Sequence, residues 1–92
     1  MEIRTELVFI ADEHILVAQG ISRLLQQLGY TAIRIFTNGE EVLKACHAKS
    51  PSMVFLDIYM PEGDGISTLR KLRNSGYTMP VIMLSMTADK KY

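Results

Sequence analysis

Acidic and hydroxyl side chains follow directly after three short apolar runs of this sequence. The pairs are residues 7–11 with Asp12 and Glu13, residues 53–56 with Asp57, and residues 81–84 with Ser85. If the three runs are parallel strands of one sheet, these four polar groups gather at one rim, which is where such sheets bind ligands. Three carboxylates this close repel one another, and the pKa of at least one rises unless a cation lies among them.

The carboxylates of Asp12, Glu13 and Asp57 offer only oxygen ligands, which suit Mg²⁺ better than zinc when there is also room for water. A carboxylate is also a competent nucleophile toward phosphorus and forms an aspartyl phosphate. A metal ion and nearby hydrogen-bond donors would stabilise charge on the transferring group. These residues therefore indicate metal-assisted phosphoryl chemistry.

Four segments predict the strands that position these groups. Residues 7–11, 53–56 and 81–84 are continuous apolar runs bounded by polar or turn residues. This is typical of strands that are buried on both faces of a parallel sheet. Residues 32–36 are half polar and suit a strand nearer an edge.

Amphipathic patterns between these segments predict helices. The first carries apolar residues at three- and four-residue steps, which predict its buried face, and a glycine that can stop the helix. These residues are Val17, Ile21, Leu24 and Leu28, followed by Gly29.

Capping residues predict two further helices. Thr37 with Glu40 three residues later is typical of a capping box, and the helix that it opens runs through Cys46. Asp64 can cap a third helix, which ends near Gly76. Strands that alternate with helices predict a parallel sheet with helices on both faces.

The composition is that of one globular domain. The 92 residues are 48% hydrophobic and 22% charged, and a chain of this length allows a single domain. Ten basic and ten acidic residues balance, which argues against direct binding of nucleic acid or of an anionic membrane. Cys46 is the only cysteine, so an internal disulfide is excluded. No apolar stretch approaches the length of a secretory signal or a membrane span, and the expected localisation is cytoplasmic.

Three segments are similar, in order and spacing, to the signature segments of response-regulator receivers of two-component systems. They are residues 10–14 (Ile-Ala-Asp-Glu-His), residues 56–65 (Leu-Asp-Ile-Tyr-Met-Pro-Glu-Gly-Asp-Gly) and residues 80–85 (Pro-Val-Ile-Met-Leu-Ser). The opening stretch through Gly20 most resembles receivers that precede a helix-turn-helix DNA-binding domain. The resemblance covers residues 1–92 as one domain. It implies an α/β fold, a flavodoxin-like doubly wound parallel sheet of order 2-1-3-4.

The resemblance also implies a role for each matching residue. Asp57 would be the phosphoacceptor that attacks the phosphohistidine of a sensor histidine kinase or phosphotransfer protein. Asp12 and Glu13 would hold Mg²⁺, joined by Asp57 and the backbone carbonyl of Tyr59. Ser85 would hydrogen-bond the phosphoryl group and move on activation. Such a receiver accepts a phosphoryl group and is not a turnover enzyme.

The sequence departs from the family pattern at two points. Glu13 stands where the family usually has Asp, and its longer arm weakens coordination of an ion that needs near-ideal octahedral ligands. The family continues with a helix, a strand ending in a lysine that pairs with the phosphoryl group, and a final helix. Lys90 and Lys91 follow the fourth strand too closely to replace that lysine. We therefore expect a receiver without its last strand and last helices, with a DNA-binding output domain if the chain is a fragment.

Two other functions are alternatives to a phosphorylated receiver. A truncated or degenerate receiver could act as a dimerisation or docking module without phosphotransfer, which the missing lysine favours and the retained Asp57 opposes. A phosphohydrolase with an aspartate nucleophile commonly has a second acid two residues on, where this chain has Tyr59. His14 is expected to lie exposed beside the rim, and two lone histidines form no metal cluster. The uncharged strand 81–84 would be an open edge, so we expect a homodimer through it.

Overall fold

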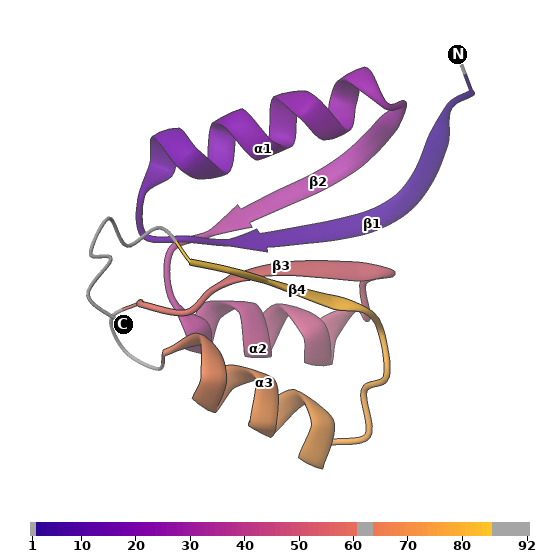
Figure 1. The fold of residues 1–92 in the computed structure, drawn as a ribbon. Helices are drawn as coiled ribbons and strands as arrows, with labels where there is room; N and C mark the ends of the chain where they lie inside the picture. The colour runs from indigo at the N-terminus through magenta and orange to yellow at the C-terminus, as the bar shows by residue number, and fades with distance from the viewer. Residues whose placement is uncertain (1, 61–63, 86–92) are drawn as a thin grey trace.

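The computed structural model describes residues 2–60 and 64–85, in which a parallel sheet lies between two helical layers (Figure 1). Along the chain the elements are β1 (Arg4–Ala11), α1 (Ile15–Gln27), β2 (Tyr30–Phe36), α2 (Gly39–Ala48), β3 (Met53–Asp57), α3 (Gly65–Asn74) and β4 (Val81–Leu84). The strand order is β2-β1-β3-β4 and every pairing is parallel, which confirms the predicted topology. Helix α1 covers one face of the sheet, and α2 and α3 cover the other. None of these helices is long and apolar enough to cross a membrane.

The register of the sheet brings the carboxyl ends of its central strands to one rim. Ala11 at the end of β1 pairs with Phe36 and with Leu56, and Asp57 pairs with Leu84. The residues that follow these strands therefore emerge side by side. The amino end of β1 extends further than predicted, to Arg4, and its first three residues are exposed.

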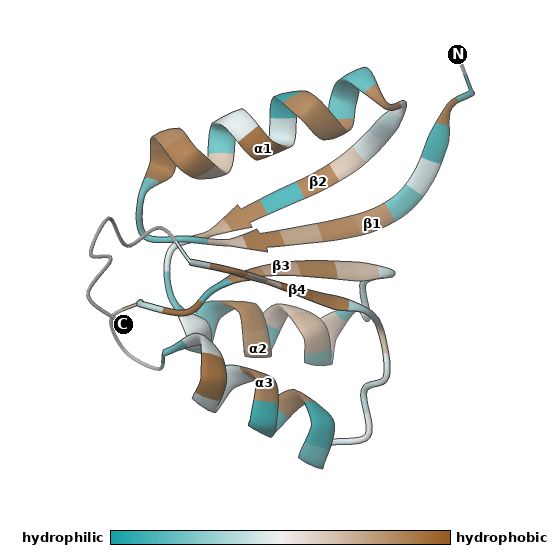
Figure 2. Ribbon diagram, viewed as in Figure 1, coloured by the Kyte–Doolittle hydropathy of each residue, from teal (hydrophilic) through white to brown (hydrophobic). Residues whose placement is uncertain are grey.

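The sheet separates two hydrophobic clusters, and the apolar strands between the helices are visible in Figure 2. The cluster under α2 and α3 contains Phe9, Ala11, Phe36, Val42, Cys46, Val54, Leu56, Met60, Leu72 and Met79. The cluster under α1 contains Val8, Ile10, Ala18 and Leu25. Both faces of β1 and β3 are thus covered, as their continuous apolar runs predict.

The predicted ends of α1 and α3 are confirmed. Gly29 follows α1 with a φ of 101°, and Gly76 follows α3 with a φ of 89°. Both values lie in the left-handed region, which glycine adopts without steric cost and which ends helices. At the start of α3, Asp64 Oδ1 accepts a hydrogen bond of 2.8 Å from the Ser67 N–H.

The start of α2 lies one residue later than predicted. Asn38, not Thr37, is the N-cap, and its Oδ1 accepts a hydrogen bond of 2.9 Å from the Glu41 N–H. Glu41, not Glu40, reaches back, and its Oε1 accepts a bond of 3.4 Å from the Thr37 N–H. Asn caps a helix at least as well as Thr, so the sequence contains two overlapping capping patterns and the later one forms.

The buried face of α1 is rotated from the predicted one. Leu24 and Leu28 are 61% and 62% exposed, whereas Ala18 and Leu25 are buried and Ile21 is partly buried. The small side chain of Ala18 permits the helix to lie close to the sheet, and Leu25 lies on the same side of the helix two turns later. Leu24 and Leu28 therefore lie beside the surface of α1 that packs on the sheet and are not part of it.

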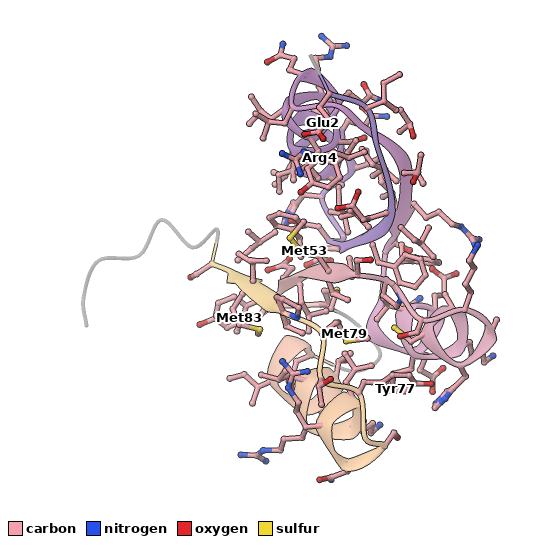
Figure 3. The ribbon with its side chains drawn as sticks, turned by 90° about the vertical axis from the view of Figure 1, so that its right-hand side faces the viewer. Glu2, Arg4, Met53, Tyr77, Met79 and Met83 are labelled. Carbon is pink, nitrogen blue, oxygen red and sulfur yellow. The ribbon has the colours of Figure 1, made fainter. Side chains whose placement is uncertain are left out.

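Tyr77 joins the loop before β4 to the end of α2 (Figure 3). Its hydroxyl lies 2.9 Å from His47 Nδ1 and donates a hydrogen bond of 3.3 Å to the Cys46 carbonyl.

Burial raises the pKa of the Cys46 thiol to about 11, so this thiol stays protonated and is a poor nucleophile or metal ligand.

Candidate functional site

Two buried aspartates lie at the rim where the central strands end. Asp57 is the last residue of β3 and Asp12 directly follows β1, and their exposed fractions are 1% and 0%. The Asp12 N–H donates a hydrogen bond of 2.9 Å to the Phe36 carbonyl, which continues the ladder between β1 and β2 past the end of the strand. Rigid strands thus fix both carboxylates at the position that the sequence predicts.

Each aspartate uses one oxygen to close a turn and leaves the other free. Asp12 Oδ1 accepts a hydrogen bond of 2.8 Å from the His14 N–H, and Asp57 Oδ1 accepts one of 3.1 Å from the Tyr59 N–H. Among residues 2–60 and 64–85, the second oxygen of each, Oδ2, is buried without a hydrogen-bond partner. Buried oxygens are nearly always paired, so two orphaned ones on carboxylates of the same cluster indicate a site for an external partner.

The electrostatics of Asp57 indicate that this partner is a cation. Burial raises the pKa of the Asp57 carboxyl, and the neighbouring Asp12 carboxylate raises it further. The Tyr59 N–H and nearby His14 act in the opposite direction. A bound cation would relieve both the desolvation and the repulsion. The donor set, two carboxylates with free oxygens, therefore fits Mg²⁺.

His14 belongs to the same cluster, which the sequence analysis missed. One ligand atom each of Asp12, His14 and Asp57 lie within 4.8 Å of one another. The His14 side chain is 60% exposed, as expected, and its Nδ1 lies 3.3 Å from Asp12 Oδ1. That the two histidines form no metal cluster by themselves stays a prediction, and the structure places His14 beside the two aspartates rather than beside His47. The turn closed by Asp12 is the cause, because it folds the residue two places on back toward the carboxylate.

Three other predicted site residues lie near the rim, and their roles stay predictions. Glu13 is exposed and is not one of the three residues whose ligand atoms converge. Tyr59 presents its N–H to Asp57, and its side chain is exposed. Ser85 is exposed and directly follows Leu84, the pairing partner of Asp57. Residues 61–63, which belong to the segment 56–65 that resembles receivers, lie outside the described part of the chain.

Gly65 brings α3 into direct contact with the backbone of the site. A Cβ atom at this position would collide with the carbonyl carbon and oxygen of Asp57 and with Cα of Ile58. The Gly65 N–H donates a bond of 2.8 Å to the Ile58 carbonyl, and the Ile58 N–H donates one of 2.9 Å to the Leu84 carbonyl. The peptide groups next to Asp57 thus connect β3 to both α3 and β4. A glycine directly after the N-cap Asp64 was the sequence signal for this close approach.

Comparison with known protein families identifies the family of the chain that carries this site. The sequence pattern of the response regulator receiver domain matches residues 8–92. The chain belongs to this family. The receiver is also similar to full-length response regulators, of which it spans about a third. It is 40% identical over 63 residues to the probable C4-dicarboxylate response regulator DctR of Bacillus subtilis, covering 68% of the receiver and 28% of that protein. It is 32% identical over 83 residues to response regulator UvrY of Escherichia coli, covering 89% of the receiver and 38% of that protein.

Solved structures agree with the fold of the receiver. The receiver domain of the Francisella response regulator 1452 matches with a TM-score of 0.83 at 29% identity, over 95% of this chain and 71% of that one. The N-terminal domain of a response regulator receiver protein from Methanoculleus marisnigri matches with a TM-score of 0.82 at 28% identity, over 96% and 72%. The expected receiver fold, with its strand order 2-1-3-4, is confirmed.

Proposed function

We propose that Asp57 of this receiver accepts a phosphoryl group from the phosphohistidine of a sensor histidine kinase or phosphotransfer protein, in the cytoplasm and with Mg²⁺. The observation that carries the proposal is the orphaned Oδ2 of Asp57, a buried carboxylate oxygen at the end of a central strand with a second carboxylate beside it. The Asp57 Oδ1 is held by the Tyr59 N–H, so Oδ2 is the oxygen available for attack. A docking module without phosphotransfer would have no use for this arrangement.

The transfer is a nucleophilic displacement at phosphorus. Asp57 Oδ2 forms the new bond to phosphorus while the bond from phosphorus to the histidine nitrogen breaks. The electron pair of that bond leaves with the imidazole, which takes up a proton. The Tyr59 N–H fixes the carboxylate during attack, and the Ser85 hydroxyl would donate a hydrogen bond to a phosphoryl oxygen. The product is an aspartyl phosphate, and the receiver acts as an acceptor used once per transfer.

Asp12 and Asp57 would hold the metal ion, with Glu13 and the Tyr59 carbonyl completing the protein ligands. When bound, Mg²⁺ would offset the charge of the carboxylates and of the transferring phosphoryl group. The burial of both carboxylates and the unpaired Oδ2 of Asp12 support this assignment. Because Glu13 is exposed and its side chain is longer than that of aspartate, we expect Mg²⁺ to bind weakly.

The proposal predicts phosphorylation at Asp57 and nowhere else. The wild-type receiver, treated with a small phosphodonor and Mg²⁺, is expected to gain the mass of one phosphoryl group, whereas Asp57→Asn gains none. Asp64→Asn is the matched control, because it changes an exposed aspartate of the same region and keeps a good helix cap. Omitting Mg²⁺ should prevent the modification of wild type and control alike. Undiminished phosphorylation of Asp57→Asn would refute the assignment.

We further propose that the receiver controls a DNA-binding output domain and forms a homodimer through β4. Relatives include the DNA-binding transcriptional regulator NtrC of Escherichia coli, which is 31% identical over 83 residues. Within the described ranges β4 pairs only with β3, residues 81–84 carry no charge, and Ile82 is exposed. An open apolar edge of this kind is a template for pairing with a second copy.

Sedimentation of Ile82→Lys tests the dimer. We expect the wild type to sediment as a dimer at micromolar concentration and Ile82→Lys to be a monomer, because a charge on an edge strand opposes pairing. Thr78→Lys adds the same charge at an exposed position before the strand and should remain dimeric. A monomeric wild type would show that the β4 edge does not pair.

A further inference from the structure

His14 places a nitrogen donor among oxygen ligands. Its Nδ1 lies 3.3 Å from Asp12 Oδ1, and one ligand atom each of Asp12, His14 and Asp57 lie within 4.8 Å of one another. An ion with bonds of about 2.1 Å separates neighbouring ligands by about 3 Å and opposite ones by about 4.2 Å. The three side chains are therefore already spaced for one ion, with only small adjustments.

The backbone holds His14 in this position. Its N–H is bonded to Asp12 Oδ1, and its carbonyl accepts the first hydrogen bonds of α1, from the N–H groups of Val17 and Ala18. The residue is the N-cap of α1, but its side chain makes no capping hydrogen bond. The main chain at this residue is thus fixed on both sides, and the imidazole is not used as a helix cap but lies with its Nδ1 beside Asp12 Oδ1.

The two carboxylates supply the second observation that a ligand site needs. Asp12 and Asp57 are almost completely buried, and Oδ2 of each has no partner within the described part of the chain. One carboxylate oxygen each of Asp12 and Asp57 and one imidazole nitrogen form a mixed set of ligand atoms. Imidazole suits Co²⁺, Ni²⁺ and Zn²⁺, whereas Mg²⁺ prefers oxygen ligands throughout.

We infer that His14 is a ligand of this site and gives it a preference for a later transition-metal cation over Mg²⁺ that the carboxylates alone would not provide. The inference rests on the proposed function, because it concerns the same metal site. It adds that the affinity of the site depends on which metal ion is present. A simple ion pair between His14 and Asp12 would produce no such preference.

Titrations of Co²⁺ and Mg²⁺ into the full chain test the inference. Replacement of His14 with glutamine should weaken Co²⁺ binding by about tenfold or more, as loss of a side chain that supports a metal typically does. Mg²⁺ binding should change by less than about twofold, because Mg²⁺ gains little from nitrogen. His47→Gln is the matched control, since it removes the other histidine, which lies on α2 and contacts Tyr77.

A spectroscopic readout identifies the ligand directly. With Co²⁺ bound, wild type and His47→Gln should show a hyperfine-shifted, exchangeable imidazole proton by NMR, and His14→Gln should lack it. His14→Asp, which makes the site all oxygen, should tighten Mg²⁺ and lower the Co²⁺ to Mg²⁺ affinity ratio.

The possible failures are distinguishable. Unchanged Co²⁺ affinity in His14→Gln, or an equal loss for both ions, overturns the inference and leaves the Mg²⁺ site of the proposed function intact. Failure of the wild type to bind either ion contradicts both the inference and the metal dependence of phosphotransfer. Binding of Mg²⁺ that Asp57→Asn does not weaken contradicts the proposed function itself.

Discussion

Gly65→Ala is expected to destabilise the receiver by about 3 kcal/mol or more, the upper range for a side chain forced into a filled space. The new Cβ would meet the carbonyl group of Asp57 and Cα of Ile58. These are main-chain atoms of β3 and of the residue after it, so they cannot rotate away as a flexible side chain could. Either α3 must move outward or the strand end must shift, and in both cases the hydrogen bond from Gly65 to the Ile58 carbonyl lengthens. Urea denaturation followed by circular dichroism measures the loss.

Gly20→Ala is the matched control and should have the opposite effect. Gly20 lies within α1, and a Cβ there would meet nothing within 4 Å. Alanine favours the helix over glycine by about 1 kcal/mol, so this variant should be more stable than the wild type. If the two alanine variants had the same stability, close packing at Gly65 would not be the cause.

Asp57→Asn is expected to stabilise the metal-free receiver at neutral pH by about 1–3 kcal/mol, the range for relief of a buried, unsatisfied polar group. The substitution removes a buried charge and its repulsion with Asp12, and it keeps an oxygen that can accept the Tyr59 N–H. Saturating Mg²⁺ should narrow the difference, because the ion stabilises only the form that binds it.

The pH dependence of the same variant identifies the cause. The folded state raises the pKa of Asp57, mainly through burial, and therefore holds this proton more tightly than the unfolded chain does. The contribution of Asp57 to stability is fully present below its unfolded-state pKa and is lost as the pH rises through the folded-state pKa. The advantage of Asp57→Asn should accordingly be small in acid and grow toward neutral pH. Asp64→Asn, at an exposed position, is the control. A constant advantage across this range would exclude ionisation of Asp57 as its origin.

The order of the elements and the position of the two aspartates could be predicted from the sequence. Continuous apolar runs identify buried strands, and a residue that directly follows such a run must lie at a rim of the sheet. This reasoning places Asp12 and Asp57 correctly, because both lie in or directly beside a hydrogen-bonded ladder.

The positions of His14 and of the leucines of α1 could not be predicted in the same way. His14 approaches the carboxylates because a side-chain hydrogen bond closes a turn, and apolar spacing carries no information on that bond. Leu24 and Leu28 fit a helical period as well as Ala18 and Leu25 do, and only the direction of the sheet decides which set is buried. Periodicity therefore predicts that a helix is present more reliably than it predicts which face of the helix is buried.

The division of the core by the sheet has a consequence for how such sequences diverge. Val8 and Phe9 are neighbours in β1, yet they belong to different hydrophobic clusters. A substitution that removes volume from one cluster can be compensated only by a larger side chain in that cluster, because the strand backbones lie between the two. Compensating substitutions should therefore covary within each cluster and not between them. The cluster under α1 and the cluster under α2 and α3 should therefore evolve independently of each other. Both contain side chains of β1 and β3, but each contains different ones.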